Sequence, residues 1–179
     1  MRYSPASINE PGRLYIAEFK LILPGSRWLQ LSQEIVDEVE QFRIAGRNDS
    51  AAFLAWFLAN LFRVEEEDAR DAVCDHTNDK GIDGVLVDEQ TSEIILFQAK
   101  FRLARNKTQG DNDLRNFVGA AKWFQSKSSV NSLLTDSTAT DDLKSLVKRL
   151  EILKLIDQYS VRLVFISSLP FDANAKEFI

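Results

Sequence analysis

Residues 78–100 read NDKGIDGVLVDEQTSEIILFQAK, and this stretch decides the fold. Two short runs within it, 84–88 and 94–97, are rich in β-branched and large apolar residues, which favour strands. The polar residues 89–93 between them are typical of a hairpin loop. The stretch therefore predicts two adjacent strands joined by a tight connection.

The expected register of this hairpin brings three polar side chains together. If the loop centre falls near residues 90–91, paired positions on the two strands sum to about 181 or 182. Asp83 then faces Gln98 or Ala99. Side chains alternate along a strand, so Gln98 and Lys100 project from the same face. We therefore expect Asp83, Gln98 and Lys100 to converge on one small patch.

Two glycines, Gly81 and Gly84, flank the aspartate. Glycine has no Cβ atom, so it tolerates sharp turns and lets a second backbone approach closely. These positions therefore predict a sharp turn into the first strand or close contact with another segment.

The three polar residue types suit a divalent cation bound next to a phosphodiester. Mg²⁺ prefers oxygen ligands and retains several waters, so one carboxylate, one amide oxygen and one backbone carbonyl can hold it. A bound metal lowers the pKa of its water and stabilises charge on phosphoryl oxygens. A lysine beside it can orient that water or stabilise the transition state. The alternative is a surface hairpin, but a glutamine and a lysine closing the most apolar strand are poorly placed for mere packing.

These residues resemble the PD-(D/E)XK nuclease superfamily. NDKGIDGVLV followed by IILFQAK looks most like the Mrr-type restriction endonucleases, in which GxD enters one strand and QxK ends the next. The motif is also similar to the amino-terminal region of the abortive-infection phage-resistance (AIPR) proteins. The resemblance implies an α/β fold with a restriction-endonuclease-like core, in which helices flank a central mixed β-sheet.

The resemblance also implies a role for each residue. Asp83 and Gln98 would be metal ligands, Ala99 would offer its backbone carbonyl, and Lys100 would be the catalytic lysine. Mg²⁺ would be the metal, and Mn²⁺ would substitute for it. The implied activity is metal-dependent DNA endonuclease cleavage in restriction or anti-phage defence, in a prokaryotic cytoplasm. Cutting both strands with one site per chain implies a homodimer, and an RNA substrate fits the same residues.

One expected ligand is not in its usual place. Many members of the superfamily carry an acidic residue in the first core helix, but residues 50–62 contain no acid. Glu34, Glu38 and Glu40 in the preceding helix are candidates to replace it, and so is Asp79; mechanisms with one metal or two both fit. The gap supports an alternative function, in which the domain is a catalytically inactive nucleic-acid-binding or assembly module.

Basic and polar residues that follow the lysine strand are candidates for phosphate contacts. Arg102, Arg105 and Lys107 come directly after this strand, and Asn116 and Lys122 lie on the polar face of the next predicted helix. A solvated surface explains the same residues equally well or better. Direct phosphate contact would make binding sensitive to salt.

The rest of the chain predicts helices around a sheet. Apolar residues at helical spacing predict amphipathic helices at 31–42, 114–124 and 143–150. Residues 50–62 predict a buried helix with Ser50 as its N-cap, and 126–140 are rich in Ser, Thr and Asp, which predicts a flexible surface insertion. Further strands are expected within 14–23, near 72–74 and at 161–166.

The length of 179 residues is enough for one domain with a substantial core. We expect a single domain over 1–179, with a helical lead-in at 1–49 and the core at 50–179. The chain stops where residues 174–178 begin to look helical. We therefore expect the amino-terminal part of a longer protein, with further domains or defence-system partner proteins.

Composition excludes several classes of protein. The net charge of −5 argues against a general nucleic-acid coat protein, although an enzyme needs only a local basic surface. The single cysteine, Cys74, allows no intrachain disulfide and fits a reducing cytoplasm; its apolar surroundings predict a buried, inert thiol. His76 is the only histidine, which excludes zinc sites built from several histidines. The longest apolar run, 51–62, is too short to cross a bilayer.

Overall fold

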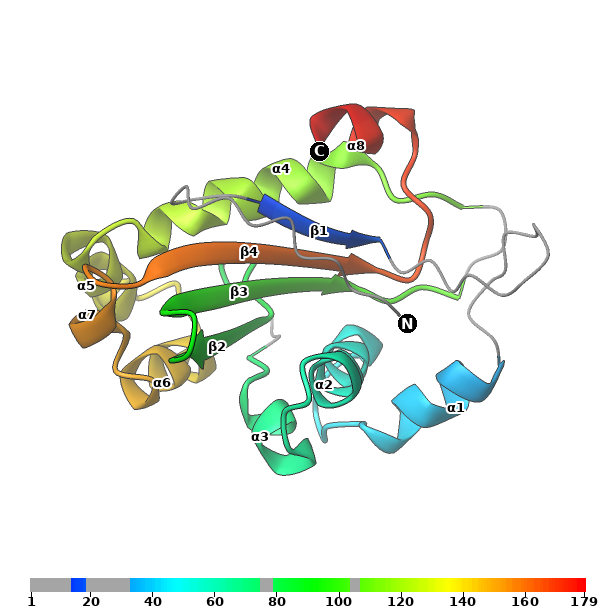
Figure 1. Cartoon of the computed structure of the whole chain (residues 1–179), viewed down its shortest axis with the longest axis horizontal. Coiled ribbons are helices and arrows are strands. Elements are labelled where there is room, and N and C mark those ends of the chain that lie inside the picture. The colour runs from blue at the N-terminus through cyan, green and yellow to red at the C-terminus, as the bar shows by residue number, and fades with distance from the viewer. Residues whose placement is uncertain (1–13, 19–32, 75–78, 104–106) are drawn as a thin grey trace.

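The computed structural model describes residues 14–18, 33–74, 79–103 and 107–179, and within them the chain forms a mixed sheet covered by helices (Figure 1). The sheet has the strand order β1-β4-β3-β2. Its strands are β1 (Leu14–Glu18), β2 (Gly84–Asp88), β3 (Glu93–Lys100) and β4 (Ser160–Ser167). The β2 and β3 strands are antiparallel, whereas β4 runs parallel to both β3 and β1. This arrangement confirms the predicted α/β class.

Helices from the first part of the chain cover one face of the sheet, and later helices cover the other face and one end (Figure 1). The first group consists of α1 (Gln33–Gln41), α2 (Asp49–Leu61) and α3 (Glu66–Asp71). The second group consists of α4 (Asp111–Ala120), a 3₁₀ turn (Ala121–Phe124), α5 (Lys127–Thr135), α6 (Asp141–Arg149) and α7 (Ile152–Leu155). The last helix, α8 (Ala173–Phe178), packs beside α4. No helix among the described residues is long and apolar enough to span a membrane.

The β3 strand separates two hydrophobic cores because its side chains alternate between the faces of the sheet. Ile94 and Leu96 pack with residues of α4 to α7, whereas Ile95 and Phe97 pack against α2. All four are at most 2% exposed, and burying a side chain of this size stabilises a fold by about 1.5–3 kcal/mol. The same alternation directs Gln98 toward the α4 side and Ala99 toward the α2 side.

The predicted N-cap of the buried helix is wrong by two residues. Asn48 caps α2, because its side-chain oxygen accepts a hydrogen bond from the Ala51 amide at 3.1 Å. Asparagine is as good an N-cap as serine, so the helix begins earlier than Ser50. The Ser50 hydroxyl instead accepts a hydrogen bond from the Phe101 amide at 3.1 Å, and so ties the start of α2 to the end of β3.

The expected flexible insertion at 126–140 is also wrong, since α5 occupies most of it. The Ser126 side chain caps this helix by accepting a hydrogen bond from the Ser129 amide at 3.2 Å. Val130 and Leu133, spaced three residues apart, are fully buried. The polar composition hid this short apolar stripe, which holds the helix against the core.

The predicted strand near 72–74 is reduced to an isolated bridge between Val73 and Gly84. Two hydrogen bonds flank this bridge: the Cys74 amide donates to the Asp83 carbonyl at 2.8 Å, and the Val85 amide donates to the Ala72 carbonyl at 3.0 Å. The segment therefore lies along the entrance to β2 without becoming a full strand.

Candidate active site

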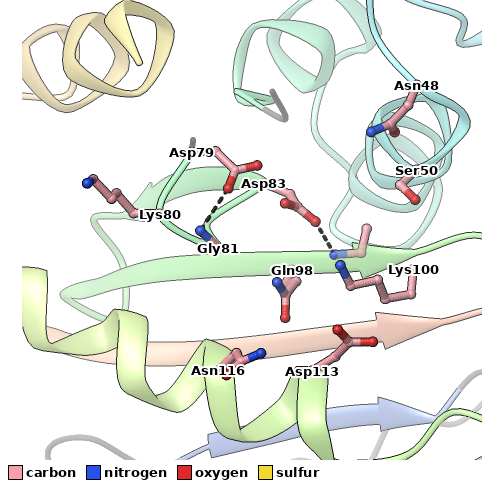
Figure 2. Close-up of a pocket in the computed structure, with 11 residues that line it drawn as sticks. Asn48, Ser50, Asp79, Lys80, Gly81, Asp83, Gln98, Lys100, Asp113 and Asn116 are labelled. Carbon is pink, nitrogen blue, oxygen red and sulfur yellow. Dashed lines mark hydrogen bonds between the residues drawn. The ribbon is translucent and has the colours of Figure 1, made fainter. Parts of the chain in front are cut away.

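A polar cleft of about 430 Å³ opens beside the carboxyl end of β3 (Figure 2). Its walls come from the start of α2, the loop at 79–83, the end of β3 and the first turns of α4. The parallel β3–β4 pair and the β2–β3 hairpin both end near this point, so segments far apart in sequence contribute to one site.

The hairpin register places Asp83 opposite Gln98, as the sequence predicted. Gly84 pairs with Phe97, and the Asp83 amide donates to the Phe97 carbonyl at 2.8 Å. The Asp83 side chain is almost fully buried, and its Oδ2 accepts a hydrogen bond from the Ala99 amide at 2.7 Å. This bond fixes the carboxylate beside the end of β3.

The buried amide of Gln98 carries an oxygen that no described residue satisfies. The Gln98 residue is 5% exposed, and its Oε1 lacks a hydrogen-bond partner in the described part of the chain. Leaving such a group unpaired costs about 1–3 kcal/mol. A hard cation would satisfy this oxygen together with the Asp83 carboxylate, so the donor set fits Mg²⁺. The described residues contain no group of three or more His, Cys, Asp or Glu side chains suited to a metal.

Lys100 ends β3 and lines the same cleft as Gln98 and Asp83. Its side chain lies beside Gln98 (Figure 2) and forms no ion pair with a described residue. The ammonium group is therefore available to a bound phosphate or water. The structure thus brings together the three residues that the motif singled out.

The loop before Asp83 is held in a left-handed turn. Lys80 and Gly81 have φ angles of 61° and 78°, and the Gly81 amide donates to Asp79 Oδ1 at 2.7 Å. This is the sharp turn that Gly81 predicted, since glycine adopts positive φ without strain. It places Asp79 in the cleft wall.

Lys80 ties this loop to the turn between α5 and α6. Its ammonium pairs with Asp136 Oδ2 at 2.9 Å and donates a hydrogen bond to the Thr138 hydroxyl. The hydrogen bond from Lys80, together with those from Thr138, holds the pKa of the Asp136 carboxyl well below its usual range.

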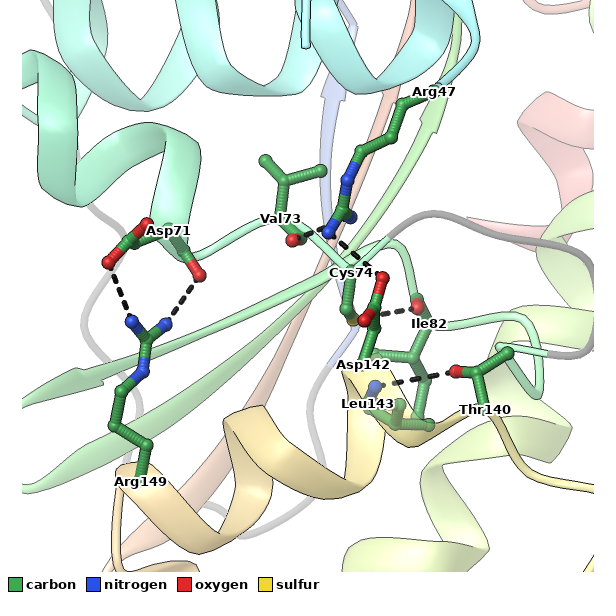
Figure 3. A network of polar contacts seen from close by, with 9 residues as sticks. All are labelled: Arg47, Asp71, Val73, Cys74, Ile82, Thr140, Asp142, Leu143 and Arg149. Carbon is green, nitrogen blue, oxygen red and sulfur yellow. Dashed lines mark hydrogen bonds and ion pairs between the residues drawn. The ribbon is translucent and has the colours of Figure 1, made fainter. Parts of the chain in front are cut away.

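The segment that leads to the loop is braced by two arginines (Figure 3). Arg47 donates to the Val73 carbonyl at 2.7 Å and pairs with Asp142 at 3.1 Å. Arg149 binds the side chain of Asp71 at 2.7 Å and also its backbone carbonyl. These contacts hold residues 71–74 beside the start of β2, next to Asp83.

Cys74 lies within this braced segment and is 1% exposed. Its thiol lies 3.3 Å from the Ile82 carbonyl. The predicted burial of the thiol is confirmed. His76 lies outside the described residues.

The structure does not bring the predicted acidic candidates of α1 into the cleft. Glu38 accepts a hydrogen bond from Trp56 Nε1 at 3.0 Å, and Glu40 forms an ion pair with Arg43. Neither Glu38 nor Glu34 lines the cleft. The physical reason is that α1 packs on α2, and α2 itself occupies the space next to β3.

The predicted phosphate contacts divide into two groups. Arg102 and Lys107 are exposed, and they line neither the cleft nor a second hollow next to it. The Arg102 amide donates to the Ser168 hydroxyl at 2.7 Å. Arg105 lies outside the described residues. Asn116 lines the cleft, and Lys122 lines a second hollow of about 300 Å³ that shares Lys80 and Asn116 with the first.

Five cleft residues were not among the predicted site residues: Lys80 and Gly81, which belong to the motif, and Asn48, Ser50 and Asp113. Asn48 and Ser50 enter from the start of α2, where Ser50 was predicted only as the N-cap and Asn48 was given no role. Asp113 lies three residues before Asn116 and therefore on the same face of α4. That spacing was the available signal for Asp113.

A family model for the Mrr catalytic domain, described as restriction endonuclease, matches residues 50–164. The match includes the loop at 79–83, β3 and α4, which together carry most of the cleft. No curated protein and no solved structure matches the chain.

Proposed function

The chain belongs to the Mrr catalytic-domain family of restriction endonucleases, and on that premise we propose that it hydrolyses DNA phosphodiester bonds with a divalent metal. The observation that carries the proposal is the buried, unsatisfied Gln98 Oε1 in the cleft that the oriented Asp83 carboxylate and Lys100 also line. An amide oxygen buried in this way is costly unless a cation or a substrate donor satisfies it.

The Asp83 carboxylate, Gln98 Oε1 and the Ala99 carbonyl would hold the ion, with Mg²⁺ as the expected metal and Mn²⁺ as a substitute. When bound, such an ion lowers the pKa of a water and neutralises charge on the phosphoryl oxygens. Lys100 orients the attacking water and stabilises the negative charge that develops at the phosphorus. Water adds to the phosphorus and the bond to O3′ breaks, which leaves a 3′ hydroxyl and a 5′ phosphate.

The two adjoining hollows give the substrate a path across α4. Asn116 and Lys80 border both hollows, and the exposed Lys122 lies in the second. We assign Asn116 and Lys122 to phosphate contacts on this path. Arg102 and Lys107 extend the same role past the end of β3.

Plasmid cleavage in Mg²⁺ or Mn²⁺ tests the proposed chemistry. Asp83→Asn keeps the shape of the side chain and removes its charge, and Lys100→Met keeps the aliphatic stem and removes the ammonium. We expect each change to lower the cleavage rate by about 10²-fold or more. Lys154→Met is the matched control, because Lys154 is an exposed residue of α7 that lines neither hollow. Full cleavage by both site variants would place the active site elsewhere.

A second function, an inactive nucleic-acid-binding or assembly module, is favoured by one observation. The α2 helix carries no acid toward the cleft, and Glu38 is engaged by Trp56. This function predicts that the wild type binds duplex DNA or RNA without cutting it in either metal. Cleavage that depends on Asp83 and Lys100 excludes it.

We propose a role in restriction or anti-phage defence, a cytoplasmic location and a homodimeric state to go with this activity. A DNA endonuclease of this family serves restriction or anti-phage defence, and its single buried cysteine suits a reducing cytoplasm. Each chain offers one site, so we expect a homodimer when both strands are cut together. Light scattering with a short duplex tests this point, and a protein that stays monomeric while cutting both strands at once contradicts it.

A further inference from the structure

Asp113 borders the cleft from the opposite wall to Asp83. It lies in the first turn of α4, while Leu114 and Phe117 of the same helix are fully buried against the sheet. This packing fixes the rotation of α4 and turns Asp113 and Asn116 toward the cleft. Figure 2 shows the Gln98 amide oxygen directed toward these two residues.

A buried glutamine holds the Asp113 carboxylate in place. Gln109 is 3% exposed, and its Nε2 donates to Asp113 Oδ2 at 2.8 Å and to the Gly110 carbonyl at 3.1 Å. Both partners are acceptors, so they define which end of the amide is the nitrogen. The Gln109 backbone is itself anchored, since its amide donates to Pro170 and its carbonyl accepts from Asp172.

Asp113 has no cationic side chain in ion-pair contact among the described residues, and its hydrogen-bond donor is a neutral amide. Asp111, two residues earlier, differs in this respect because Arg115 of the same helix pairs with it at 2.7 Å. A carboxylate that is oriented by a buried amide and left charged in a cleft is suited to a cation.

Gln98 Oε1 points independently to a ligand at the same place. It is a buried acceptor without a partner among the described residues, and it faces the side of the cleft where Asp113 lies. An ion bound to Asp83 and Gln98 alone would have a single charged ligand. The cleft offers a second on α4.

We propose that Asp113 is the second carboxylate of the cation site. The α4 helix, which follows β3 in the chain, thus supplies the carboxylate that residues 50–62 lack. This inference rests on the proposed metal-dependent function, and it assigns a ligand to that site.

Calorimetric titration of the full chain with Mn²⁺ tests the inference without relying on activity. Asp113→Asn retains an acceptor for Gln109 and removes only the charge, so we expect Mn²⁺ affinity to fall by about 10- to 100-fold. Asp83→Asn is expected to weaken binding to a similar extent. Asp111→Asn is the matched control on the same helical turn, and it should change the affinity by less than about twofold, because Asp111 does not line the cleft.

The outcomes separate this inference from the proposed function. If Asp83→Asn loses Mn²⁺ binding while Asp113→Asn binds as the wild type does, the role of Asp113 is refuted and the metal-dependent function stands. If the wild type does not bind Mn²⁺ at all, both are refuted. Equal losses of Mn²⁺ affinity in Asp111→Asn and Asp113→Asn would also refute the inference. They would show that the ion responds to the total negative charge at the start of α4 and not to direct binding by Asp113. Thermal unfolding of each metal-free variant verifies that it is folded.

Discussion

The substitution Gly84→Ala tests how closely residues 72–74 pack against the backbone next to Asp83. A Cβ atom there would lie 2.9 Å from the Ala72 carbonyl oxygen and 2.9 Å from Leu54 Cδ2. Both neighbours belong to the buried core, at 3% and 0% exposed. The Ala72 carbonyl also accepts the Val85 amide at 3.0 Å, so it cannot retreat without weakening that bond.

The expected cost of Gly84→Ala follows from these contacts. Overpacking of a well-packed core costs about 1–3 kcal/mol. Weakening the Val85 bond adds about 0.5–1.5 kcal/mol, and the lower entropy of the unfolded alanine chain offsets about 0.4–1 kcal/mol. We therefore expect a net loss of about 0.5–4 kcal/mol, or a fall in Tm of about 1–16 °C for a chain of this length.

Gly119→Ala is the matched control for this prediction. Nothing lies within 4 Å of a Cβ added at Gly119, which is an exposed residue near the end of α4. Alanine is the better helix former, so this variant should be unchanged or stabilised by up to about 1 kcal/mol.

Urea and thermal unfolding followed by circular dichroism measure both glycine variants. We also expect Gly84→Ala to lose cleavage activity, because β2 cannot move without moving the adjacent Asp83. A Gly84→Ala protein as stable as the wild type would refute the close approach of residues 72–74 to β2. So would equal destabilisation by both substitutions.

Two further substitutions test the surroundings of the cleft. Asp136→Asn removes the partner of Lys80 and should destabilise the fold at neutral pH. The pKa of Asp136 is lowered in the folded state. The ionised carboxylate therefore contributes fully to the free energy of unfolding well above about pH 4, and this contribution is lost as the pH falls toward the folded-state pKa. Urea unfolding at several pH values should show that the difference in free energy of unfolding between Asp136→Asn and the wild type shrinks in acid. Asp157→Asn, at an exposed position, is the control. A difference that grows in acid would contradict the stabilising role of the ionised Asp136 carboxylate. Lys122→Gln should weaken duplex binding and lower the slope of log Kd against log salt by about 1, whereas Lys154→Gln should not. An unchanged slope for Lys122→Gln would remove that residue from the DNA path.

The core of the candidate site could be predicted because it depends on local geometry. The length of the loop and the alternation of side chains set the register that pairs Asp83 with Gln98. Gly81 and Gly84 together indicated a sharp turn or a close approach, and the structure has the turn at Gly81 and the close approach at Gly84. These features need no knowledge of the remaining chain.

Errors arose where two local solutions had similar free energies. Asn48 and Ser50 are equally good N-caps, and the contact of Ser50 with Phe101 decided between them. The polar segment 126–140 became the helix α5 because Val130 and Leu133 reach the core. Tertiary contacts selected the outcome in both places.

By itself, the amino-acid sequence determined the β2–β3 hairpin, the three polar residues at its end and the α/β class of the fold. The tertiary structure decided which acid stands across from Asp83. Glu38 was excluded because α1 packs on α2 and the indole of Trp56 binds its carboxylate, whereas Asp113 was selected because α4 packs on the sheet through Leu114 and Phe117. Strand pairing over a short loop is a local property, but the side of a helix that meets a cleft depends on packing between elements that are distant in the sequence.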